Sequence, residues 1–120
     1  MSNDANARNA RARWSRRAAA AAVVFAALGD PTRLALVGKL GDGSQRSITE
    51  LGQDSALTRQ AVSKHLRVLE DAQVVRSERA GRENLYVLNP QPIADLGNYI
   101  ELVSSQWDAA LSRLKAFVEG

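Results

Sequence analysis

Five hydrogen-bonding side chains lie close together in a segment that also carries a regular apolar stripe. They are Arg59, Gln60, Ser63, Lys64 and Arg67. At about 100° per residue, they fan across one side of a helix, and Val62, Leu66 and Leu69 cluster on the other. The sequence therefore predicts an amphipathic helix from Thr58, which can act as its N-cap, to about Ala72.

The polar face of this predicted helix carries groups that can read base pairs. Arginine or lysine can donate to guanine O6 and N7, and glutamine can pair with adenine N6 and N7. Serine and the first amides of a helix can bind phosphate. The alternative is an ordinary solvated face, which any surface helix has. The elements on either side of the helix favour DNA binding.

A short helix and a tight turn come directly before this segment. Ser47-Ile48-Thr49-Glu50 has the pattern of a capping box and opens a helix to about Asp54. Ser55-Ala56-Leu57 then forms the turn. A short helix joined by a turn to a longer one is the arrangement of a helix-turn-helix.

A hairpin with a basic tip is predicted directly after it. Val74–Ser77 and Leu85–Leu88 have the pattern of strands around Ala80-Gly81-Arg82. Three arginines surround the turn, Arg76, Arg79 and Arg82, and their positive charge is partly offset by Glu78 and Glu83. Such a wing can lie along the phosphate backbone. The predicted DNA contacts are Thr58, Arg59, Gln60, Ser63, Lys64, His65, Arg67, Arg79 and Arg82.

His65 is the only histidine and lies at the edge of the apolar stripe. It is expected to pack or to contact phosphate, because no second metal ligand lies nearby in the sequence. Tyr86 alternates with apolar neighbours and is expected to be structural.

The remaining elements complete a mostly α fold of the winged helix-turn-helix type, in the order α-α-α-α-β-β-α. Residues 1–14 are predicted to be a flexible basic arm, and residues 15–120 a DNA-binding and dimerisation domain. An Ala-rich helix is expected over Ser15–Leu28. Asp30-Pro31 starts the next helix, which stops at Gly41-Asp42-Gly43. Asn89-Pro90-Gln91-Pro92 precedes a final helix to about Val118.

The charge of the chain is uneven. The formal net charge is +3, but residues 1–22 hold five arginines against one aspartate. The other 98 residues hold 11 basic and 12 acidic side chains, so DNA binding by the body depends on local placement. This balance keeps a protein-interaction module without specific DNA binding as the alternative function. The basic arm could contact phosphate or be a solvated tail.

Composition argues against several other classes. With no cysteine, one histidine and no clustered carboxylates, no nucleophile and base can be paired, so an enzyme is not expected. No stretch of about 18 apolar residues is present, so no membrane span is expected. The run Ala18–Leu28 superficially resembles a signal peptide but continues into the helix start at Asp30-Pro31. A cytoplasmic location is therefore expected.

Three segments together resemble the ArsR/SmtB family of winged-helix repressors. They are Phe25–Arg33, Ala61–Leu69 with its Ser-Lys-His-Leu core, and Leu85–Leu88. The resemblance spans about Val23 to Val118. It implies a homodimeric repressor that releases operator DNA when an effector binds, with Arg59, Gln60, Ser63 and Lys64 at base- and phosphate-contacting positions.

Two features depart from that family's pattern. Its metal-sensing members use cysteines before the turn, or Asp, His and Glu sets in the last helix. Ile48–Asp54 has no cysteine and the last helix no histidine, so no metal or other cofactor is expected. Gln73 stands where the family usually has glycine; a left-handed residue there costs roughly 1 kcal/mol, and a local difference at the helix end is expected.

The last helix carries apolar residues at alternating spacings of three and four, as a coiled-coil seam does. A helix packed on its own domain gives a similar pattern, but Leu102 and Val118 widen the apolar surface. A two-fold dimer through the first and last helices is therefore predicted, reading an inverted repeat. The predicted interface residues are Val24, Leu96, Ile100, Val103, Trp107, Leu111, Leu114 and Phe117. A small-molecule effector, a protein effector or none all remain open.

Overall fold

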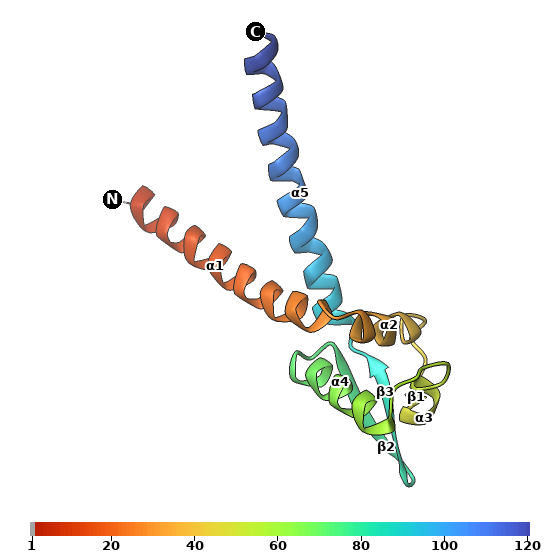
Figure 1. The fold of residues 1–120 in the computed structure, drawn as a ribbon. Helices are drawn as coiled ribbons and strands as arrows, with labels where there is room; N and C mark the ends of the chain where they lie inside the picture. The colour runs from red at the N-terminus through yellow and green to blue at the C-terminus, as the bar shows by residue number, and fades with distance from the viewer. Residues whose placement is uncertain (1) are drawn as a thin grey trace. The chain divides into compact units, whose positions relative to one another are not determined.

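The computed structural model describes residues 2–120 as eight elements (Figure 1). They are α1 (Ser2–Leu28), α2 (Pro31–Lys39), β1 (Arg46–Ser47), α3 (Ile48–Leu51), α4 (Arg59–Asp71), β2 (Val75–Ala80), β3 (Glu83–Leu88) and α5 (Pro90–Glu119). The chain forms two units. Ala22–Ile93 is the recognition unit, and the residues up to Ala21 with Ala94–Gly120 form the helical unit.

The recognition unit is a winged helix-turn-helix, as predicted. Its three-stranded antiparallel sheet has the order β1-β3-β2. In the hairpin, Val75 pairs with Leu88 and Ser77 pairs with Tyr86, and β2 runs beside α4 (Figure 1). The predicted order lacked β1, which has only two residues and therefore no detectable alternation of its own.

Side-chain caps begin three of the helices where the sequence predicted. The Asp30 carboxylate accepts from the Arg33 backbone N–H at 3.0 Å, and Pro31 follows the cap. The Thr58 hydroxyl accepts from Ala61 N–H at 3.1 Å. Ser47 forms the complete capping box of α3. The caps satisfy helix-end donors, so these starts are encoded locally.

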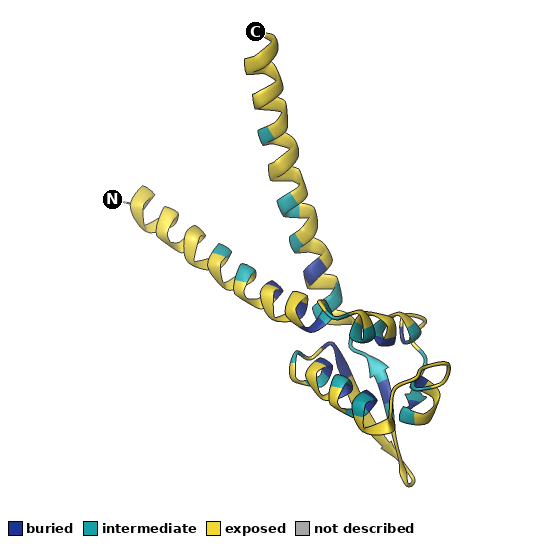
Figure 2. Cartoon of the chain, in the orientation of Figure 1, coloured by how far each residue is buried: buried dark blue, intermediate teal, exposed yellow. Residues whose placement is uncertain are grey.

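The core of the recognition unit lies along the inner face of α4 (Figure 2). Val62, Leu66 and Leu69 are each 1% exposed or less. The other fully buried large side chains of the unit are Leu40, Leu51, Val74 and Val75. These residues come from the C-cap of α2, from α3 and α4, and from the chain entering the wing, so packing fixes α4 against the elements beside it.

The prediction for the first helix was wrong at its beginning. The expected helix started near Ser15 after an irregular arm, but α1 begins at Ser2. Alanine and arginine both have high helix propensity, and they make up six of the seven residues 7–13. Their propensity outweighs the missing apolar period that suggested an arm. In the helical unit, the Trp14 ring of α1 lies 5.6 Å from the Tyr99 ring of α5.

Smaller corrections concern element ends. The short helix expected to reach Asp54 stops at Leu51, and the strand expected over Val74–Ser77 covers Val75–Ala80. The turn residue Gly81 has φ 64°, the left-handed conformation its glycine permits.

No single helix among residues 2–120 is long and apolar enough to cross a membrane; α1 and α2 meet that test only as a bent pair.

Candidate DNA-binding surface

The exposed face of α4 carries the predicted hydrogen-bonding set. Of its members, Thr58, Arg59, Gln60, Lys64 and Arg67 are exposed and Ser63 is half-buried. The exposed set begins at the helix N-cap and is concentrated in the first turns. Because the opposite face is buried in the core, packing holds these donors on an open surface.

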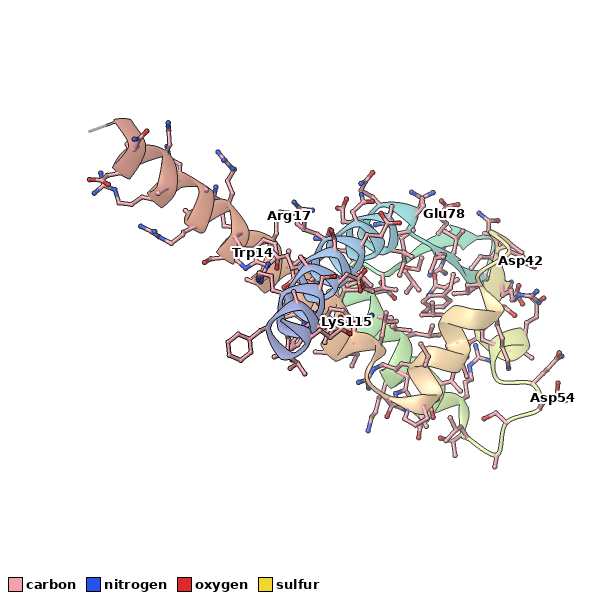
Figure 3. The ribbon with its side chains drawn as sticks, turned by 90° about the horizontal axis from the view of Figure 1, so that it is seen from above. Trp14, Arg17, Asp42, Asp54, Glu78 and Lys115 are labelled. Atoms are coloured by element: carbon pink, nitrogen blue, oxygen red, sulfur yellow. The ribbon has the colours of Figure 1, made fainter. Side chains whose placement is uncertain are left out.

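Contacts with α3 fix the start of α4. Arg59 Nη1 donates to the Thr49 hydroxyl at 3.4 Å, which joins the two helices across the turn. Lys39 Nζ donates to the carbonyls of Leu51 and Gln53, at 2.9 and 3.1 Å, and so satisfies the C-terminal end of α3. The turn contains Asp54 at φ 64°, in the exposed loop before α4 (Figure 3).

The wing presents more positive than negative charge at its tip. Glu78 is held by Gln45, whose amide donates at 2.8 Å, and lies 3.6 Å from Arg76. Arg79 donates to the carbonyl of Gly81 at 3.2 Å, which keeps its guanidinium at the turn. Both Arg79 and Arg82 are exposed and have no ion pair among the described residues.

His65 makes two close contacts within the recognition unit. Its Nδ1 lies 3.4 Å from Arg33 Nη1 and 3.8 Å from Asp30 Oδ2, at the start of α2. The backbone hydrogen bond from Arg33 lowers the pKa of the Asp30 carboxyl, and the charges of Arg33 and His65 act in the same direction. No local pattern of residues indicates this contact, because its two residues are 32 positions apart.

Tyr86 is buried, and its burial raises the pKa of its phenol. Its position inside the unit agrees with the structural role expected for it. Within residues 2–120, no three His, Cys, Asp or Glu side chains come together as a group that could hold a metal ion.

The residues predicted to form a dimer interface divide into two groups. Val24 and Leu96 are each 7% exposed and are therefore already buried within one chain. The other six, all on α5, are more open: Trp107 is 65% exposed and Phe117 is 83% exposed, Ile100, Leu111 and Leu114 are exposed as well, and Val103 is half-buried.

Comparisons with known proteins match this architecture. The family model of a helix-turn-helix domain matches residues 28–78. YuzN, an HTH-type transcriptional regulator of Bacillus subtilis, is 38% identical over 79 residues, which cover 61% of this chain and 86% of YuzN. An ArsR-like transcriptional regulator from Rhodococcus sp. RHA1 superposes with a TM-score of 0.71 at 32% identity, over 82% of this chain and 92% of that one.

The chain belongs to the ArsR/SmtB family of transcriptional regulators. The repressor SmtB of Mycobacterium tuberculosis is 40% identical over 77 residues, which cover 64% of this chain and 56% of SmtB. As a family member the chain is a DNA-binding transcriptional regulator, and its relatives are regulators rather than enzymes. The family model covers α2, α3 and α4 in full, and most of α1 and all of α5 lie outside it.

Proposed function

We propose that this ArsR/SmtB-family regulator is a repressor that binds an inverted-repeat operator as a homodimer, reading it with α4 and gripping its backbone with the wing. The separation of polar and apolar side chains on α4 supports this proposal: its hydrogen-bond donors are exposed, while Val62, Leu66 and Leu69 are buried. The proposed contacts are Thr58, Arg59, Gln60, Ser63, Lys64, Arg67, Arg79 and Arg82.

Two kinds of DNA contact are proposed, one to base edges and one to phosphates. Side chains from the first turns of α4 enter the major groove and donate to base edges. Arg79 and Arg82 at the wing tip neutralise phosphates, which adds affinity at every sequence and makes it depend on salt. Repression is favoured by relatives that are themselves repressors, among them SmtB and BigR of Xylella fastidiosa. Binding to chromosomal DNA would place the regulator in the cytoplasm.

A second copy of the chain supplies the symmetry that an inverted repeat requires. The exposed apolar residues of α5 support this part of the proposal, since single chains seldom leave so continuous a stripe in water. In a two-fold dimer, the two copies of α4 would enter successive major grooves on one side of the duplex.

The deciding experiment replaces Arg59 and Lys64 together with alanine. An operator is first selected from random duplexes with the full chain, and affinities for operator and unrelated DNA are then measured at one salt concentration. We expect specific binding to disappear, because each bidentate base contact contributes about 1–3 kcal/mol.

A matched control removes the same charge from the far end of α5, by replacing Arg113 and Lys115, both exposed, with alanine. This control should keep its preference for the operator. Operator preference that survives in the Arg59 and Lys64 variant would contradict the assignment of α4.

A further inference from the structure

His65 joins α4 to the beginning of α2 through a single nitrogen atom. Its Nδ1 lies 3.4 Å from Arg33 Nη1 and 3.8 Å from Asp30 Oδ2. The side chain is 24% exposed, so most of its surface is covered by the protein. The residues one turn away on α4 carry no charge: Ala61, Val62, Val68 and Leu69. Asp30 and Arg33 are the charged groups in contact with the imidazole among the described residues.

Both partners of the imidazole are held by other bonds. Arg33 Nε donates to the Ala27 carbonyl at 2.6 Å, and Nη2 donates to the Ala26 carbonyl at 3.3 Å. These carbonyls belong to the last turn of α1, and the Ala26 carbonyl also accepts from the Gly29 backbone N–H at 3.3 Å. Asp30 is fixed as the N-cap of α2. Because both partners are held in place, a change of hydrogen-bond partner falls to the imidazole.

The chemistry of Nδ1 allows only one of the two contacts at a time. A guanidinium only donates and a carboxylate only accepts, whereas an imidazole nitrogen accepts when unprotonated and donates when protonated. Neutral His65 therefore accepts from Arg33 and carries its proton on Nε2. Protonated His65 stands beside a second cation and can donate only to Asp30.

We propose that His65 is a positioning residue of the recognition helix. Neutral His65 ties α4, through Arg33, to the end of α1; protonation transfers the hydrogen bond of the imidazole to Asp30 and so loosens the link that positions α4. Operator recognition then depends on whether His65 is protonated. This inference rests on the proposed function, because it requires that α4 reads the operator.

The first test measures the ratio of operator to non-specific affinity from pH 8 to pH 5.5 at constant salt. Non-specific affinity does not fall in acid, because protonation adds positive charge, so the ratio isolates positioning. We expect the ratio to fall about fivefold in the unmodified chain, the value of one hydrogen bond. His65→Gln should give a ratio that does not vary with pH, because the amide both accepts from Arg33 and donates to Asp30 without titrating.

The second test needs neither DNA nor a variant. His65 is the only histidine, so its two ring nitrogens can be assigned without ambiguity in the ¹⁵N spectrum of the full chain. We expect the neutral ring to carry its proton on Nε2, and a neutral ring protonated at Nδ1 would overturn the inference.

Equal pH profiles for the unmodified chain and His65→Gln would also overturn it. If the Arg59 and Lys64 variant loses operator preference while those two profiles coincide, the proposed function stands and only the role of His65 fails.

Discussion

Replacing Leu114 with alanine should weaken self-association while leaving the recognition unit folded. Leu114 is 58% exposed on α5 and lies outside the core of Ala22–Ile93. Fully burying a leucine contributes about 2 kcal/mol, so burying its exposed part contributes about 1 kcal/mol. A two-fold interface holds two copies, which raises the loss to about 2 kcal/mol and the dimer dissociation constant about 30-fold.

Sedimentation equilibrium over a range of concentrations measures this constant directly. Ser112→Ala is the matched control, because Ser112 is exposed two residues away and its replacement removes no apolar surface. Circular dichroism confirms that each variant keeps its helices. Equal dissociation constants for Leu114→Ala and Ser112→Ala would refute the reasoning that the α5 stripe forms the interface.

Three further predictions concern the caps and the charge of α1. Ser47→Ala should lower the free energy of unfolding by about 1 kcal/mol in urea titrations, because Glu50 N–H loses its acceptor in the capping box. Hydrogen bonds from Ser47 lower the pKa of Glu50, so its contribution to stability is present above pH about 4.3, its value in an unfolded chain, and is lost as the pH falls through the lower folded-state pKa. Glu50→Gln should therefore reduce the loss in the free energy of unfolding as the pH falls into the acidic range. An unchanged loss would show that other carboxylates cause it. Replacing Arg8 and Arg16 with glutamine should lower the salt slope of DNA binding by about 2 if α1 contacts phosphate, whereas an unchanged slope would identify a solvated face.

The elements that position the DNA-binding surface could be predicted because their signals are local. Thr58 accepts from a backbone group three residues away, and the Ser47–Glu50 box closes over the same distance. The stripe of Val62, Leu66 and Leu69 repeats within one helix, so its burial followed from spacing alone. Each of these features depends on residues only a few positions apart, so a pattern in the sequence is enough to predict it.

The features that escaped prediction depend on partners distant in sequence or on competing local terms. β1 exists only because Arg46 and Ser47 pair with Tyr86 and Leu85 of β3. The link between Arg33 and His65 likewise joins two segments that only the folded chain brings together. The start of α1 was misplaced for another reason. Trp14 lies about 160° from Arg16 around the helix, and no apolar stripe runs along this segment. The absence of such a stripe does not indicate disorder in a segment rich in alanine, because alanine favours the helix by itself.

The end of α4 shows how distant contacts replace a local signal. Gln73 adopts φ 62°, a left-handed conformation that costs a residue with a side chain about 1 kcal/mol. The local difference expected at this helix end is therefore not observed, since Gln73 keeps the left-handed turn without glycine. Val74 N–H donates to the Leu69 carbonyl at 2.9 Å, and the Asn89 amide donates to the Gln73 carbonyl at 3.0 Å. With Val74 fully buried, these bonds offset the cost. The direction in which the chain leaves α4 and enters the wing is thus set by hydrogen bonds from Asn89, the residue that follows β3, so α4 and the wing are held as one reading surface.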